Sequence, residues 1–169
     1  MTGNILERRK YFESEVDVRE MIIIDNGTES VKIGRSGVDY PSVIIDTISG
    51  YPHVISDNDA SPPKKIYFGK ELEGILEAKK YNVQFGYPIE HSRIQDQYFE
   101  DMTDLWDFAL RELMGIDPSS ADILIIDSSA NSKKYKAKII EKVFEKLKAQ
   151  SVLVMNSSVL SLFSVGATM

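Results

Sequence analysis

The sequence predicts an α/β fold, in which helices pack against a mixed β-sheet. Two observations carry this prediction. An apolar segment at 21–25 and a second at 30–34 flank a turn, which is typical of a hairpin. The second half of the chain then alternates short apolar runs with longer segments whose apolar residues recur every three to four positions. A hairpin followed by alternating helices and strands is typical of a mixed sheet covered by helices.

The predicted sheet begins with the hairpin. Met21–Asp25 is a compact apolar strand, and Asn26-Gly27 after it is a strong turn signal. Ser30–Gly34 returns as the second strand. Pro41–Ile48 is rich in β-branched residues, so we expect a third strand there.

The segment that follows carries weaker signals. His53–Lys65 is predicted to be an exposed loop, because Pro62 and Pro63 lack the N–H donors that a strand needs. Ile66–Phe68 fits a short strand. Gly69–Lys79 has apolar residues at helical spacing and fits a short helix.

The second half of the chain gives the clearest pattern. Gln97–Met114 is predicted to be an amphipathic helix that ends at Gly115. Trp106 lies on its apolar face, where packing in the core is the ordinary role of a tryptophan. Asp122–Asp127 places four apolar residues between two acids, which indicates a buried strand.

Three more elements complete the alternation, a helix at Ser132–Lys148, a strand at Ser151–Met155 and a helix at Asn156–Val165. The first of these helices is expected to turn five apolar side chains inward, Ile139, Ile140, Val143, Phe144 and Leu147. Its seven lysines are expected to face solvent, with a partner or nucleic-acid contact as the alternative.

Composition narrows the class of protein. The chain has 169 residues, 43% of them apolar and 27% charged, which is typical of one globular domain with its own core. A net charge of −6 argues against nucleic acid as a partner, and no apolar run is long enough to cross a membrane. Residues 1–20 form a polar extension without a secretory signal, so we expect a cytoplasmic or cytoskeletal protein, with the nucleus as the alternative.

The hairpin segment 25–34, DNGTESVKIG, is the most informative motif. A tight loop with Gly27 and small hydroxyl residues can aim backbone N–H groups at a phosphate, and Lys32 can reach the same anion. Asp25, at the end of the first strand, can hold Mg²⁺ through water. Taken alone the segment is also an ordinary hairpin turn.

Five segments of the chain together resemble the actin and actin-related protein family. In order they are IIIDNGTESVKIGRSG, YPSVIIDTISGYP, YPIEHSRIQD, the helix with Trp106, and VLSLFSVG. The resemblance covers roughly 21–169 and implies the N-terminal subdomains one and two of an actin-like (ribonuclease H-like) ATPase domain. A subdomain-two-like insertion is then expected at about 51–86.

The resemblance implies a role for six residues. Asp25, Gly27, Thr28, Ser30 and Lys32 fall on the loop that holds the β- and γ-phosphates of the nucleotide and its divalent metal. His91, in YPIEH, falls on the histidine that senses this site in actins. The implied cofactor is ATP or ADP with Mg²⁺, which Asp25 would hold through water.

Three departures from the family pattern count against ATP hydrolysis, and a fourth concerns filament contacts. Glu29 replaces a glycine of the loop, and its carboxylate would repel a triphosphate by on the order of 1 kcal/mol at a screened site. Ser157, at the position of the family's water-positioning glutamine, is too short for that role. The loop 53–65 lacks the apolar tip that enters the next filament subunit. The chain stops at Met169, before the family's second phosphate loop, and hydrolysis needs groups on both sides of the γ-phosphate.

We therefore expect a divergent, truncated actin-like structural subunit of a larger cytoskeletal assembly, and no enzyme, with a vestigial phosphate loop. Its cofactor is either absent or ATP or ADP with Mg²⁺. One alternative is an ATP-binding actin-related protein whose other half comes from another chain or was lost. The other is a mimic that binds actin-binding partners. Protein partners in a multi-subunit complex, other actin-family chains among them, should bury the helix at Asn156–Val165, which has more apolar residues than one face can hide.

Overall fold

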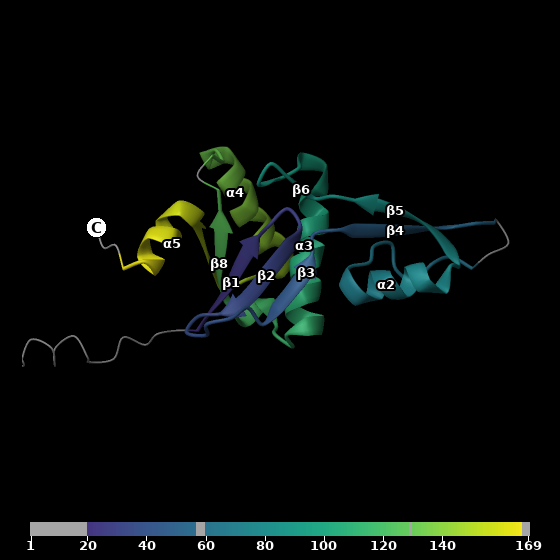
Figure 1. The fold of residues 1–169 in the computed structure, drawn as a ribbon, viewed down its shortest axis with the longest axis horizontal. Helices are drawn as coiled ribbons and strands as arrows, with labels where there is room; N and C mark the ends of the chain where they lie inside the picture. The colour runs from purple at the N-terminus through teal and green to yellow at the C-terminus, as the bar shows by residue number, and fades with distance from the viewer. Residues whose placement is uncertain (1–19, 57–59, 129, 167–169) are drawn as a thin grey trace, which may run out of the picture.

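The computed structural model describes residues 20–56, 60–128 and 130–166, which form a five-stranded mixed sheet with helices around it (Figure 1). The strand order is β3-β2-β1-β8-β9, and β1 pairs antiparallel with β2 and parallel with β8. The strands are β1 (Met21–Asn26), β2 (Ser30–Arg35), β3 (Val43–Asp46), β8 (Asp122–Asp127) and β9 (Ser151–Asn156). The predicted fold class is confirmed.

Two helices cover one face of the sheet. They are α3 (Phe99–Phe108) and α4 (Lys133–Lys142), and each continues into a π-helical turn, at Ala109–Leu113 and Val143–Leu147. Every second residue of the inner strands points to this face and is buried, as the period of two in a strand requires. Trp106 is completely buried there, so its expected place in the core is confirmed.

The opposite face of the sheet, called the open face below, is more exposed in the described part of the chain. It carries the alternate residues of the same strands. Ile23 and Met155 are half-buried there, and Leu153 is 49% exposed. The last helix, α5 (Ser157–Ser164), packs beside β9 and has no fully buried residue.

A two-stranded ribbon projects from the sheet, formed by β4 (Ser49–Val54) and β5 (Tyr81–Gly86) with α2 (Gly69–Ala78) beside it (Figure 1). The insertion expected at 51–86 falls within this unit. The hydroxyl of Ser49 donates a hydrogen bond of 2.8 Å to Oδ2 of Asp101 on α3.

The ribbon is held to α3 by a second hydrogen bond at the same carboxylate. The Tyr51 hydroxyl also donates to Oδ2 of Asp101, a carboxylate that is 9% exposed. Burial, reinforced by the hydrogen bond to Asp101, raises the pKa of Tyr51 above its ordinary value. The tyrosine therefore remains a donor throughout the neutral range.

The first half of the chain departs from the predicted elements at three points. The strand expected over Pro41–Ile48 is only Val43–Asp46, because the chain then leaves the edge of the sheet to begin β4. His53 and Val54, expected in a loop, pair with β5, a strand that was not predicted. The short strand expected at Ile66–Phe68 is a single bridge between Tyr67 and Gly50.

The second half departs in the helix expected over 132–148. Phe144 was expected to point inward but is 43% exposed. It lies at the edge of the apolar stripe, since Ile140 one turn earlier is also only half-buried, while Val143 and Leu147 are buried. The lysines of this helix were expected to face solvent, yet Lys138, Lys142 and Lys146 reach across to α3.

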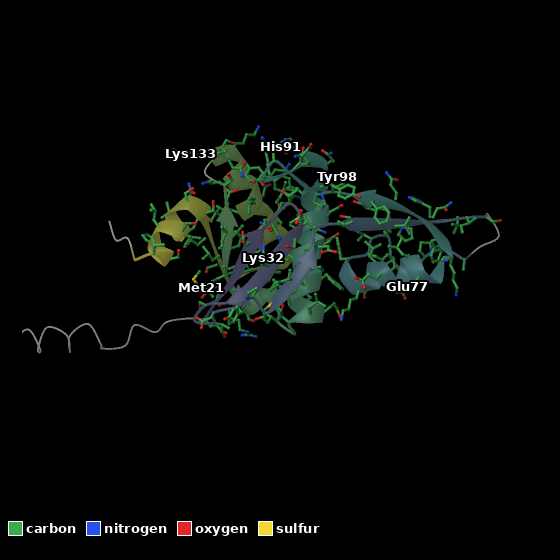
Figure 2. All side chains as sticks on the ribbon, in the orientation of Figure 1. Met21, Lys32, Glu77, His91, Tyr98 and Lys133 are labelled. Atoms are coloured by element: carbon green, nitrogen blue, oxygen red, sulfur yellow. The ribbon has the colours of Figure 1, made fainter. Side chains whose placement is uncertain are left out.

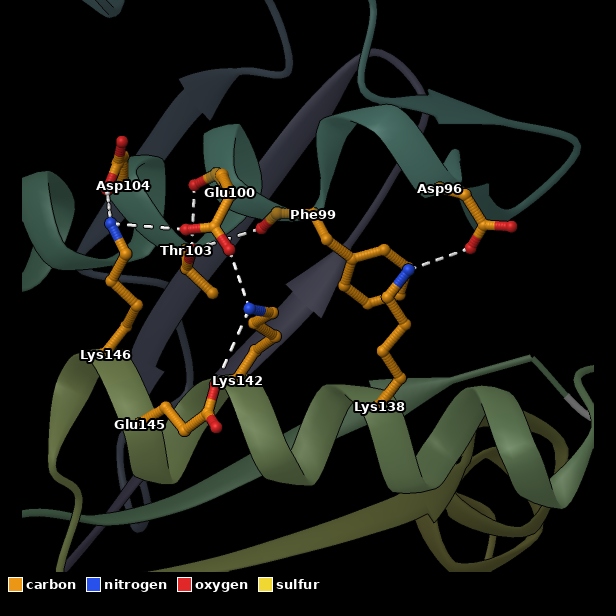
Figure 3. A network of polar contacts seen from close by, with 9 residues as sticks. All are labelled: Asp96, Phe99, Glu100, Thr103, Asp104, Lys138, Lys142, Glu145 and Lys146. Carbon is orange, nitrogen blue, oxygen red and sulfur yellow. Dashed lines mark hydrogen bonds and ion pairs between the residues drawn. The ribbon is translucent and has the colours of Figure 1, made fainter.

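These three lysines form a ladder of ion pairs with acids of the α3 segment (Figure 3). Lys138 contacts Asp96 at 3.0 Å, and Lys142 contacts Glu100 at 2.7 Å. Lys146 pairs with both Glu100 and Asp104, at 3.3 and 3.0 Å. Four-residue spacing on both helices brings each lysine opposite an acid.

Two remaining expectations concern the ends of the chain and membranes. The polar extension expected at 1–20 lies outside the described residues, except for Glu20, which pairs with Arg35 at 2.9 Å. Among the helices that the structure describes, none is both long and apolar enough to span a bilayer.

Candidate functional site

The loop between β1 and β2 turns one residue later than the sequence predicts. Asn26 still belongs to β1, and the Gly27 amide donates to the Ser30 carbonyl at 3.1 Å, so Thr28 and Glu29 form the apex. A Cβ on Gly27 would lie 2.6 Å from the carbonyl oxygen of Ser30. Glycine is therefore needed here for a close backbone approach, and not for the left-handed conformation of an Asn-Gly turn.

Three hydrogen bonds from distant elements hold this loop. The Thr47 hydroxyl donates to the Gly27 carbonyl at 2.8 Å, and the Thr47 amide donates to the Glu29 carbonyl at 2.9 Å. The indole N–H of Trp106 donates to Oδ1 of Asn26 at 3.0 Å. The loop is thus positioned by Thr47, directly after β3, and by α3 before any ligand binds.

The apex of the loop presents two backbone donors. No described residue accepts a hydrogen bond from the amide of Thr28 or of Glu29, and both residues are exposed. Consecutive free amides at a turn form a small concave site for an anion. The exposed Glu29 side chain brings a negative charge to the same apex.

Asp25 and Lys32 lie opposite each other on β1 and β2, and both face the open side of the sheet. Together with Tyr40 they line a hollow of about 190 Å³. Figure 2 shows Lys32 over the middle of the sheet. Ser30, which was also predicted to belong to the loop, begins β2 and pairs with Asp46 of β3.

A second cavity, of about 200 Å³, lies at the carboxyl ends of β1 and β8 and is mainly polar. Asp25 lines it as well, together with Asn26, Asp127, Ser128 and Ser157. The structure therefore brings Asp25 and Ser157 to one cavity. The carboxyl ends of neighbouring parallel strands meet at one edge of the sheet, as this class of fold leads us to expect.

Asp127 is the residue of this cavity that the sequence analysis missed. Its side chain is only 4% exposed, and its Oδ1 accepts a hydrogen bond of 2.7 Å from Nδ2 of Asn131. Its Oδ2 accepts no hydrogen bond from the residues that the structure describes, although Nζ of Lys136 lies 3.7 Å away. The sequence did contain a signal for Asp127, because it is an acid at the carboxyl end of a buried strand.

His91 is separated from the loop residues. It lies in the turn between β6 (Ile89–Glu90) and β7 (Arg93–Ile94), and its side chain is 90% exposed at the rim of the molecule (Figure 2). His91 and Ser92 have φ values of 50° and 59°, which is the backbone of a type I′ hairpin turn. Ser92, and not His91, lines the polar cavity.

The wall of the cavity below this turn is held by Tyr135 of α4. The Tyr135 hydroxyl accepts a hydrogen bond of 2.8 Å from the Ile94 amide. Burial raises the pKa of Tyr135 to about 12, so the phenol stays neutral at physiological pH. Among the described residues, no three or more His, Cys, Asp and Glu side chains gather closely enough to hold a metal ion by themselves.

Comparisons with known proteins agree with the resemblance of the five segments. A family model described as Actin matches residues 16–169. The chain is 34% identical over 155 residues to Actin-related protein 2 of Saccharomyces cerevisiae, covering 89% of this chain and 38% of that protein. It is 28% identical over 153 residues to Actin-related protein 2 of Arabidopsis thaliana, with the same coverage. The match to Actin-related protein 2 of Schizosaccharomyces pombe is 31% over 147 residues, covering 86% and 36%. The chain thus spans a little over a third of the length of these relatives.

Proposed function

Because the chain belongs to the actin family, we propose that it is a divergent actin-like structural subunit of a larger cytoskeletal assembly and does not hydrolyse ATP. It works by contact with other proteins in the cytoplasm. The open face of the sheet, together with the neighbouring helix α5, is the observation that carries this proposal.

This surface displays large apolar side chains at one side of the molecule. Leu153 of β9 is 49% exposed, and Leu162 and Phe163 of α5 are 56% and 45% exposed. The two elements are neighbours, and large exposed apolar side chains that lie together mark interaction sites in soluble proteins. We infer that another protein surface covers it, supplied either by more of an actin-type protein or by a separate subunit.

Two side chains support the absence of hydrolysis. Glu29 brings its carboxylate to the loop apex, where a γ-phosphate would meet it. Ser157 lines the polar cavity at the position that the family resemblance gives to a glutamine. Its hydroxyl is too short to orient an attacking water from that backbone position, and positioning is most of what phosphoryl transfer requires of a protein.

Nucleotide binding without hydrolysis is the second candidate, because the free amides of Thr28 and Glu29 suit one phosphate group. Lys32 would add a cationic contact and Asp25 would hold Mg²⁺ through water. When bound, Mg²⁺ would neutralise part of the negative charge of the phosphates at this loop. The residues present thus fit a phosphate, while Glu29 weakens its binding.

The proposal is tested by purifying the chain alone at micromolar concentration. We expect light scattering to show self-association, and a variant with Leu153→Asn, Leu162→Asn and Phe163→Asn to be a monomer with an unchanged melting temperature. The control is Phe144→Asn, on the opposite side of the sheet and 43% exposed, which should leave the association as it is. A cooperative, soluble monomer whose Phe163 amide is protected from hydrogen exchange would rule the proposal out.

A further inference from the structure

A groove of about 420 Å³ runs along the edge strand β3, between the start of α2 and the end of α3. Its floor is apolar. Ile45 is buried, while Ile44 and Leu113 are 62% and 48% exposed, and Phe108 lies between them in a half-buried position. The floor therefore offers surface that a partner could remove from water.

The banks of the groove are acidic. Asp46 of β3, Glu73 of α2 and Glu112 after α3 are all exposed, and none of them makes an ion pair or hydrogen bond through its side chain with a described residue. Glu71 is neutralised by Lys64 at 2.8 Å. Lys70 is the one cation among the described residues that line the groove.

We propose that this groove binds a basic amphipathic helix of another protein, with apolar residues on its inner face and lysine or arginine on both flanks. The three free carboxylates come from three different elements and surround the apolar floor. A helix that lays an apolar stripe on the floor brings its flanking cations to these banks. Such complementary charges select partners and raise association rates.

The surface is distinct from the one that carries the proposed function. The variants of the open face use Leu153, Leu162 and Phe163, and none of these residues lines the groove. A failure to bind basic helices would leave the proposed function unaffected. A failure of the open-face test would likewise leave the groove proposal unaffected.

The test is fluorescence anisotropy of the full chain with a labelled 18-residue peptide, which has leucines at positions i, i+3, i+4 and i+7 and lysines on both flanks. The variant with Asp46→Asn, Glu73→Gln and Glu112→Gln should weaken binding roughly tenfold, since each exposed ion pair contributes little by itself. Leu113→Ser should also weaken binding.

The matched control removes three exposed carboxylates elsewhere, with Asp39→Asn, Glu77→Gln and Glu141→Gln. It has the same net charge as the groove variant and should bind like the unchanged chain. Equal affinities of the two triple variants would overturn the proposal, because attraction would then follow net charge alone. Equal binding of a scrambled peptide with the same composition would overturn it as well.

Two further experiments test for other occupants of the groove. If deletion of residues 1–19 raises the affinity for the peptide tenfold or more, the chain's own N-terminal segment fills the groove, and the proposal fails. If the chain is a dimer that the groove variant converts to a monomer, the occupant is a second copy, and the proposal also fails. Unchanged affinity and unchanged mass in these two experiments support the external helix.

Discussion

Trp106 and Asn26 lie eighty positions apart in the chain and share one hydrogen bond, from the indole N–H to Oδ1. The tryptophan is therefore a core residue that also holds the stem of the candidate phosphate loop. The sequence predicted its burial from the apolar period of the helix. It could not predict the bond, because the partner comes from a distant strand that only the tertiary fold brings near.

We predict that this bond is measurable in a double-mutant cycle. Trp106→Phe keeps an aromatic ring but removes the donor, so a partly buried amide oxygen loses its partner, at a cost of about 1–3 kcal/mol in unfolding free energy. Urea unfolding of Trp106→Phe, Asn26→Ala and the double variant should show a coupling energy of at least about 0.5 kcal/mol. Strictly additive losses would show that the two side chains act independently.

Gly27 gives a second prediction at the residue scale. Gly27→Ala should lower the unfolding free energy by about 1–3 kcal/mol, because the new Cβ would lie 2.6 Å from the Ser30 carbonyl oxygen and strain the loop. The matched control is Gly74→Ala within α2, where a Cβ meets nothing within 4 Å. That change should raise stability by roughly 0.5–1 kcal/mol through helix propensity. Melting temperatures that shift in the same direction in both variants would contradict this account of the loop.

At the scale of elements, the lysine ladder binds α4 to α3. Hydrogen bonds from Lys142, and then from Lys146, lower the pKa of Glu100 below its ordinary value. A carboxyl whose pKa is lower in the folded state stabilises the fold at pH values above its unfolded pKa. This stability is lost as the pH falls through the folded pKa.

We therefore predict a pH-dependent effect of Glu100→Gln. At pH 7 the variant should be less stable than the unchanged chain by at most about 1 kcal/mol, because the pair is exposed. The difference should shrink as urea unfolding is repeated toward pH 3, and it should also shrink in high salt. Glu77→Gln, on α2 and without an ion pair among the described residues, is the control and should change little. If the difference in unfolding free energy were constant between pH 3 and pH 7, the effect would come from packing and not from charge.

Sequence patterns located every strand of the central sheet, although the expected bounds of β3 were too wide, and they missed the second strand of the ribbon. Alternating burial along β1 and β2 and the apolar run of β8 follow directly from the residues. The segment at Tyr81–Gly86 alternates apolar and polar residues through Tyr81, Val83 and Phe85, a strand signal that the sequence analysis missed, and this strand pairs with β4. Phe144 was placed wrongly because the apolar residues of this helix span a wider arc than the core covers, and only the tertiary contacts decide which part of the arc is buried.

At the scale of the whole molecule, the candidate site was predictable only in part. Asp25, Gly27 and Lys32 were identified on one hairpin, and the structure keeps them together. Asp127 was missed because its place beside the loop depends on the parallel pairing of β8 with β1. The role that the resemblance implies for His91 stays a prediction, since its side chain points away from the cavity that its neighbour Ser92 lines.

The molecule combines a rigidly held loop between β1 and β2 with an exposed apolar surface on β9 and α5. Thr47 and Trp106 hold the loop, so its two free amides remain available to an anion. Glu29 opposes that anion from the same apex. Leu153 of β9, and Leu162 and Phe163 of α5, are exposed outside the buried core. We infer that the domain acts through contact with other proteins, and that binding of a nucleotide contributes little to its function.

Calorimetric titration of the full chain with Mg-ATP tests this claim most directly. We predict no saturable binding heat up to millimolar nucleotide, and no more than a slight gain for Glu29→Gly. Saturable binding with a micromolar dissociation constant would contradict the account and support the nucleotide-binding candidate in its place.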